Sequence, residues 1–181
     1  MIPVLRFAMP SEHTRKYQLP FRWPKSPINI VLVEPKIPQN TGNIARLCAG
    51  TGSRLHLVKP LGFRITDKDL KRAGLDYWEH VEVDTHENYC AFREQNPTPR
   101  TFLFSTAGQR NLYDVRFKAG DALVFGSETE GLSDELLEEA DPEQVVQIPI
   151  VTDYVRSLNL ASSVSIVLYE ALRQIDANNL D

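Results

Sequence analysis

The segment Arg156-Ser157-Leu158-Asn159-Leu160-Ala161-Ser162-Ser163-Val164-Ser165 decides the interpretation of this chain, because its polar side chains gather where a helix is predicted to begin. The first turn of a helix has unpaired backbone N–H groups, and short hydroxyl and amide side chains add to them. Such a helix start is suited to binding a small polar or anionic group. The alternative is an N-cap in front of a core helix, since the residues that follow are largely apolar.

Two other segments have the same character. Residues 38–48 (PQNTGNIARLC) follow the apolar run 28–33 and open a helix. Residues 123–133 (LVFGSETEGLS) begin as an apolar strand and end in a polar loop bracketed by glycines. Each segment therefore places polar residues where a predicted strand is followed by a helix.

The composition is that of one compact α/β domain. The chain has 181 residues, of which 42% are hydrophobic, and this is enough to bury a core. The two cysteines, Cys48 and Cys90, lie in apolar helical patterns, so neither a disulfide framework nor a metal cluster is expected. No apolar run is as long as a membrane span, and the first residues lack a signal-peptide pattern. We therefore expect a soluble cytoplasmic protein with no membrane and no metal partner.

Charge is distributed unevenly along the chain. Residues 1–27 contain five basic residues and one acidic residue, a local excess of +4, whereas the whole chain carries a formal charge of −4. Together with its prolines, this composition predicts a flexible basic extension over 1–27 that either contacts RNA phosphates or is a solvated tail. The domain is expected over 28–181. Because this body is acidic, any RNA site on it must be a local basic patch.

Apolar runs that alternate with helical intervals predict a mostly parallel sheet flanked by helices. The expected strands are 28–33, 55–58, 81–83, 101–104, 122–125 and 145–148. The expected helices are 43–51, 67–73, 87–94, 134–140 and 157–175. In such folds, ligands bind at the carboxyl ends of the strands. The chain has neither the Gly-x-Gly-x-x-Gly pattern of dinucleotide-binding folds nor a P-loop, so these two classes of nucleotide site are excluded.

The segments 40–48, 123–133 and 148–174 resemble, in order and spacing, the three motifs of the SPOUT RNA methyltransferases. With Arg72-Ala73-Gly74-Leu75-Asp76-Tyr77-Trp78 between the first two motifs, the chain is most similar to the tRNA wobble-nucleotide 2′-O-methyltransferases. The resemblance covers residues 28 to about 174. It implies methylation of the ribose 2′-OH of nucleotide 34, a cytidine or a carboxymethylaminomethyluridine, with S-adenosylmethionine as the methyl donor.

The resemblance also implies features that periodicity does not predict. These are a C-terminal trefoil knot, a homodimer with composite active sites, and the anticodon stem-loop of tRNA as the partner. Carried over by position, the cofactor contacts fall on Phe104, Gly126, Ile148, Ser157 and Leu158. An apolar slot suits an adenine ring, and a glycine lets the backbone approach a ligand, although Gly126 is also explained by a plain turn.

The catalytic residues that the resemblance implies are Arg46, Ser157, Glu128 and Asn159. A guanidinium stays protonated at neutral pH, so Arg46 either clamps a phosphate and orients the ribose or takes part in removing the proton of the hydroxyl. The alternative is a surface arginine on an amphipathic helix. Glu128 accepts a hydrogen bond from the substrate, positions Arg46, or is a simple loop carboxylate. Asn159 is expected to fix the loop that contains Ser157.

The substrate-binding residues that the resemblance implies are Asn40, Asn43, Arg156 and Tyr169. Two of them have structural alternatives, because Asn43 could be a helix cap and Tyr169 could pack at a helix interface. Residues 152–155 make the loop before Arg156 about one residue longer than the subfamily pattern.

Three functional alternatives remain open at this point. The motifs indicate ribose chemistry but not its target, so methylation of rRNA or of another tRNA position is the second reading. A non-catalytic RNA-binding protein on the same fold is the third.

A zinc site around His80, Glu82, Asp84 and His86 is disfavoured because the spacing matches no common zinc pattern, and these are expected to be surface residues.

Overall fold

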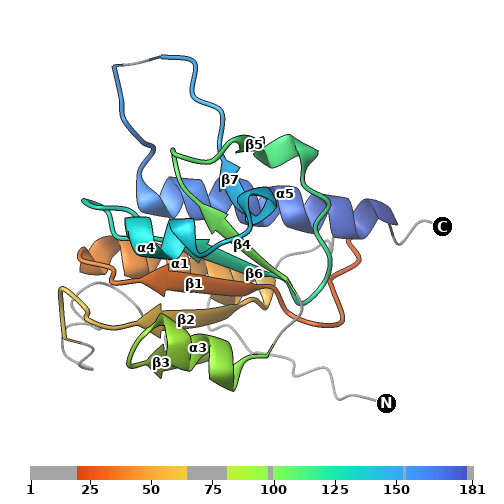
Figure 1. Cartoon of the computed structure of the whole chain (residues 1–181). Coiled ribbons are helices and arrows are strands. Elements are labelled where there is room, and N and C mark those ends of the chain that lie inside the picture. The colour runs from red at the N-terminus through yellow and green to blue at the C-terminus, as the bar shows by residue number, and fades with distance from the viewer. Residues whose placement is uncertain (1–19, 65–80, 98–99, 153, 179–181) are drawn as a thin grey trace.

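The computed structural model describes residues 20–64, 81–97, 100–152 and 154–178, and within them it has a single seven-stranded sheet (Figure 1). Every neighbouring pair of strands is parallel. The order is β3-β2-β1-β6-β4-β7-β5. The strands are β1 (Asn29–Val33), β2 (Arg54–Val58), β3 (Val83–His86), β4 (Thr101–Phe104), β5 (Arg110–Asn111), β6 (Ala122–Phe125) and β7 (Val145–Gln147). The α/β fold class is therefore confirmed, and the trefoil knot stays a prediction.

The helices begin and end where the local sequence favours it. They are α1 (Pro38–Thr51), α3 (Tyr89–Gln95), α4 (Asp134–Glu138) and α5 (Leu160–Asn178), with short 3₁₀ turns η2 (Leu112–Asp114) and η3 (Pro142–Gln144). Pro38 is at the first helical position of α1, and Gly52 ends this helix in the left-handed conformation, with φ 68°. The side chains of Asn88 and Ser133 cap α3 and α4. Among the described residues, no helix is long and apolar enough to cross a membrane.

Alternate residues of the central strands pack on opposite faces of the sheet. On β1, Ile30 and Leu32 belong to the large core cluster that includes α1 and α5, whereas Val31 belongs to a smaller cluster with Phe92 of α3. Helices consequently cover both faces (Figure 1). This explains why the central strands are nearly continuous apolar runs, because parallel strands are buried on both sides.

Most strands lie within one residue of their predicted ranges, and the exceptions have physical reasons. The strand expected at 81–83 is instead β3, which begins at Val83 and continues through the polar Asp84 and Thr85. β3 is at the edge of the sheet, where exposed polar side chains are tolerated. The helix expected from 157 begins at Leu160, and the helix expected at 67–73 lies outside the described residues.

The last residues of the expected basic extension lie against the domain. Phe21 packs on the large core cluster, and its ring centroid is 4.6 Å from that of Trp23. The backbone N–H of Arg22 donates to the carboxylate of Asp176 on α5 at 2.8 Å. The boundary at residue 28 stays a prediction, but Phe21 and Arg22 contact the body, and residues 1–19 lie outside the described part.

A chain of buried polar side chains crosses the sheet at β1, β2 and β3. His56 Nε2 lies 3.2 Å from Asn29 Oδ1, and His56 Nδ1 lies 3.1 Å from His86 Nε2. The other ring nitrogen of His86 lies 3.0 Å from Gln95 Oε1. His86 was expected at the surface, but only 3% of it is exposed, so that expectation is wrong. Burial lowers the pKa of His56 from 6.5 to about 4.

We predict that this buried histidine makes the protein less stable at acid pH. His56 of the unfolded chain takes up a proton as the pH falls below 6.5, whereas His56 of the folded chain takes it up only below about pH 4. Stability should fall as the pH drops through that window, by about 2 kcal/mol between pH 7 and pH 5 from this residue. Urea unfolding at pH 7, 6 and 5 measures the effect.

His56→Gln is the matched variant, because it can keep hydrogen bonds in the chain but cannot titrate. We expect it to be less stable at pH 7 and to lose less stability on acidification than the parent. Titratable groups that do not contact His56 are the same in both proteins, so their contributions cancel in the comparison. An identical pH dependence of the two proteins would contradict the prediction.

Candidate functional site

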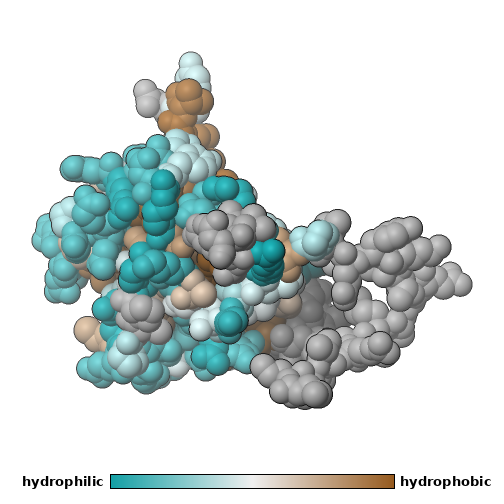
Figure 2. Space-filling model, turned by 90° about the vertical axis from the view of Figure 1, so that its right-hand side faces the viewer, coloured by the Kyte–Doolittle hydropathy of each residue, from teal (hydrophilic) through white to brown (hydrophobic). Residues whose placement is uncertain are grey.

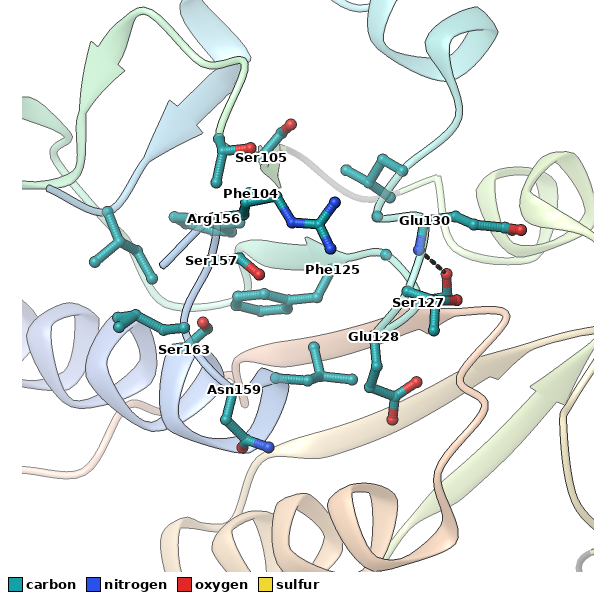
Figure 3. Close-up of a pocket in the computed structure, with 18 of the residues that line it drawn as sticks. Phe104, Ser105, Phe125, Ser127, Glu128, Glu130, Arg156, Ser157, Asn159 and Ser163 are labelled. Atoms are coloured by element: carbon teal, nitrogen blue, oxygen red, sulfur yellow. Dashed lines mark hydrogen bonds between the residues drawn. The ribbon is translucent and has the colours of Figure 1, made fainter. Parts of the chain in front are cut away.

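A pocket of about 440 Å³ opens at the carboxyl ends of β4, β6 and β7 (Figure 3). Its walls come from the loops that follow these strands, from the beginning of α1 and from the segment that leads into α5. This is the edge at which parallel α/β sheets bind ligands. The three polar segments singled out in the sequence therefore meet at one cavity.

One wall of the pocket is apolar. Phe104 and Phe125 are the last residues of β4 and β6, and their rings stack with centroids 4.9 Å apart and planes 14° from parallel. Ile148, after β7, and Leu158, before α5, complete this wall. The arrangement offers a flat heterocycle an apolar slot at the ends of rigid strands.

The opposite wall is organised by the carboxylate of Glu128. Its Oε2 accepts a hydrogen bond from the backbone N–H of Lys36 at 2.7 Å. Its Oε1 accepts from the backbone N–H of Ile37 at 3.2 Å and from the amide of Asn40 at 3.0 Å. Glu128 thus binds the two backbone N–H groups just before α1, where Ile37 at the N-cap has no capping side chain, and its negative charge is favourable at this helix end.

The same network continues to α5 through two asparagines. Asn40 Oδ1 accepts a hydrogen bond from Asn159 Nδ2 at 3.0 Å. Asn159 Oδ1 in turn accepts from the backbone N–H groups of Ala161 at 2.9 Å and Ser162 at 3.3 Å, so Asn159 is the N-cap of α5. Glu128, Asn40 and Asn159 therefore tie together three segments that are far apart in the sequence.

Gly126 is required by the protein backbone itself. A Cβ at this position would lie 1.9 Å from the carbonyl carbon of Gly131. The two residues close a tight loop in which Ser127 and Gly131 exchange backbone hydrogen bonds at 3.1 and 3.0 Å. Gly131 itself has φ 74°, which favours glycine. Gly126 lines the pocket, but close packing of this loop is sufficient to explain it.

Polar groups of the segment before α5 face the cavity. Ser157 lines the pocket, and the side chain of Arg156 extends over it (Figure 3). Glu130, in the loop after β6, lines the pocket as well. The pocket therefore combines an apolar slot with an arginine, a hydroxyl and carboxylates around it, which suits a ligand with both an aromatic ring and charged groups.

Nine of the twelve site residues expected from the sequence line this pocket. They are Asn40, Phe104, Gly126, Glu128, Ile148, Arg156, Ser157, Leu158 and Asn159. The other three, Arg46, Asn43 and Tyr169, are exposed and do not line it. Arg46 and Asn43 are on the solvent side of α1, and Tyr169 is on that of α5.

Sequence reasoning missed several lining residues. Phe125 was assigned only to a strand, and Ser105 and Ile150 were not singled out, whereas Ser163 was part of the polar segment 156–165 but was given no role in the site. The available signal for Phe125 and Ser105 was their position, since each stands at the carboxyl end of a predicted strand. Nothing in the local sequence indicates that Ile150 reaches the cavity.

No group of three or more His, Cys, Asp or Glu side chains in the described part of the chain could hold a metal ion. His86 pairs with His56 in the core, and His80 lies outside the described residues. Both cysteines are free, and burial raises the pKa of the Cys48 thiol to about 12, which makes it unreactive.

Comparison with known proteins agrees with this geometry. A tRNA (cytidine(34)-2′-O)-methyltransferase of Methylovorus glucosotrophus is 50% identical over 148 residues, covering 82% of this chain and 96% of its own length. A structure described as giving insights into the 2-OH methylation of C/U34 on tRNA matches with a TM-score of 0.76 and 46% identity, over 82% of this chain and 96% of that one.

The fold is shared more widely. A SpoU methyltransferase of Streptomyces viridochromogenes, solved in complex with the cofactor AdoMet, matches with a TM-score of 0.68 at 23% identity, over 86% of this chain and 59% of that one. The model of the SpoU rRNA methylase family matches residues 27–169, which contain every strand of the sheet and every residue of the pocket. The chain therefore belongs to the SpoU rRNA methylase family.

Proposed function

We propose that this protein methylates the ribose 2′-OH of the wobble nucleotide, position 34, of tRNA, with S-adenosylmethionine as the methyl donor. The observation that carries the proposal is the convergence of nine expected site residues on one pocket. The curated relative at 50% identity, whose name specifies this reaction, supports the substrate. Such an activity belongs in the cytoplasm, in keeping with the composition.

The residues of the pocket fit the methyl donor. A volume of about 440 Å³ is within the range of small-molecule sites. The stacked pair Phe104 and Phe125 offers the adenine an apolar slot, together with Ile148 and Leu158. The hydroxyl of Ser157 and the backbone of the tight loop that follows Gly126 offer hydrogen bonds to its polar groups.

The bound donor supplies an electrophilic methyl group on a sulfonium, and the protein must align a ribose oxygen with it. Arg156 extends over the pocket and provides a cation for the RNA backbone near its mouth. Glu128 is a poor candidate for the base, because its carboxylate already accepts three hydrogen bonds. We assign Glu128 and Asn159 to positioning: they hold the loops that carry Ser157 and the pocket wall.

The functional unit that we propose is a homodimer. Arg46, the residue implied to orient the ribose, is exposed on α1 and does not line the pocket of its own chain. A second copy docked on the α1 and α5 side can bring its Arg46 to this pocket and provide the composite site. Exposed apolar side chains on α5, Ile166 and Tyr169, support this face as the contact.

The direct test incubates the purified protein with labelled S-adenosylmethionine and total tRNA from a strain that lacks the enzyme. Nuclease digestion and mass spectrometry then locate the label. We expect it on the ribose of nucleotide 34. Label at another tRNA position, or on rRNA tested in parallel, would support ribose methylation but refute nucleotide 34 as its target. The absence of label from both RNAs would refute the enzymatic proposal.

Complementation between two inactive variants tests the composite site. Arg46→Ala should abolish methyl transfer but leave cofactor binding intact. Gly126→Ala should also be inactive, because the added methyl group collides with Gly131 and deforms the pocket wall. If Arg46 acts on the partner's pocket, an equal mixture should recover about a quarter of the parent activity, since half of the dimers are mixed and each has one intact site.

The complementation has a clear opposite outcome. An arginine that acts within its own chain leaves no intact site in a mixed dimer, so the mixture would stay inactive. Sedimentation must first show that both variants are dimers and exchange subunits. A parent protein that is monomeric and fully active would refute the dimer itself.

Replacement of Glu128 separates a positioning role from a catalytic one. Glu128→Gln removes the charge and at least one of the three accepted hydrogen bonds, so the free energy of unfolding should fall by roughly 1–3 kcal/mol and the KM for both substrates should rise. Glu130→Gln, in the same loop, is the control for stability and should change it by less than about 0.5 kcal/mol. A loss of kcat at unchanged stability and KM would identify Glu128 as a catalytic group instead.

A further inference from the structure

The loop between β7 and α5 projects away from the body of the protein and ends in apolar side chains. Figure 1 shows this loop as the outermost feature of the fold, and the same projection stands at the top of Figure 2 with hydrophobic atoms. Val151 is 103% exposed and Tyr154 is 98% exposed. The backbone N–H of Tyr154 donates to Thr152 Oγ1 at 3.2 Å. The Tyr154 side chain is therefore exposed to solvent and available to a partner.

Both ends of this loop are walls of the pocket. Ile148 and Ile150 line the pocket before the projection, and Arg156 and Ser157 line it afterwards. Tyr154 is two residues from Arg156, whose side chain extends over the cavity (Figure 3). The exposed ring therefore belongs to a loop that borders the mouth of the site.

The proposed reaction requires an RNA base at this mouth. The ribose oxygen must enter the pocket to reach the methyl group, and the base is attached to the neighbouring carbon of the same sugar. Single-stranded loop bases are recognised mainly by stacking on aromatic side chains and arginine planes, with cations on the adjoining phosphates. Tyr154 and Arg156, two residues apart, provide this combination of an exposed aromatic ring and a cation.

We propose that Tyr154 is a substrate-positioning residue on which an unpaired anticodon-loop base, at or next to the methylated nucleotide, stacks. This inference rests on the proposed function and adds a contact to it. An RNA partner is favoured over a second protein copy because residues at both ends of this loop line the pocket that the ribose must enter.

The test uses an anticodon stem-loop RNA with 2-aminopurine in place of the base at position 34 or 35. Stacking on Tyr154 should quench the fluorescence of the bound probe, and Tyr154→Ala should abolish that quenching at one of the two positions. Tyr154→Ala should also weaken binding of the unmodified stem-loop by about tenfold, as expected for the loss of one stacked base. Tyr154→Phe should bind within about threefold of the parent, because it keeps the ring.

Kinetics and a matched control complete the experiment. Tyr154→Ala should raise the KM for RNA about tenfold with little change in kcat, and the affinity for S-adenosylmethionine should be unchanged. Tyr113→Ala removes another exposed tyrosine, on η2 and outside the pocket, and should change none of these quantities. Because RNA binding and quenching are measured without methyl transfer, a failure of the proposed reaction does not conceal the result.

Three outcomes would overturn the proposal. Unchanged RNA affinity and quenching in Tyr154→Ala would show that no base stacks there. A dimer that dissociates on this substitution would assign the loop to a second copy of the chain. Loss of affinity for S-adenosylmethionine would make Tyr154 part of the cofactor wall.

Discussion

The hydrogen bonds of the Glu128 carboxylate hold together loops that the sheet only brings to the same edge. Two backbone N–H groups before α1 and the amide of Asn40 donate to it, and Asn40 passes the connection to Asn159 at the start of α5. A carboxylate is suited to this position because hydrogen bonds to a charged acceptor are stronger than neutral ones, and because the N-terminus of a helix favours negative charge. Without this network, the walls of the pocket would be independent surface loops.

The rigidity of the opposite wall has a different origin. Phe104 and Phe125 end adjacent parallel strands, which are paired over their full length and buried on both faces. Their rings are consequently fixed by the core, whereas the polar wall is fixed by hydrogen bonds. The tight loop between Gly126 and Gly131 joins the two walls. A side chain at Gly126 would collide with Gly131, and Gly131 has a positive φ of 74° that favours glycine. Both walls of the pocket are therefore held by contacts within the protein itself, which suits catalysis by positioning.

The pattern of apolar runs predicted the interior of the fold well and its margins poorly. The central strands are recognisable because burial on both faces leaves them without polar residues. β3 was misplaced because an edge strand can carry Asp84 and Thr85 towards solvent, and β5 was not expected at all because two residues give no periodicity. His86 was predicted to be a surface residue, because only the fold brings the side chains of His56 and Gln95 within hydrogen-bond distance of its ring. The start of α5 was placed three residues early, because Asn159 is the N-cap that accepts from Ala161 and Ser162, so Ser157 and Leu158 precede the helix.

The sequence by itself predicted nine of the residues that line one pocket, since three ordered motifs place them near strand ends and helix starts. Tertiary structure decided what those residues do. Glu128 has no local partner in the chain, and its role follows from the loop before α1, about ninety residues away. Arg46 is in the first motif, yet the helix turns it away from the pocket of its own chain. Hydrophobic periodicity is a local property that a sequence records directly, whereas a hydrogen bond between distant loops depends on how the strands are ordered in the sheet.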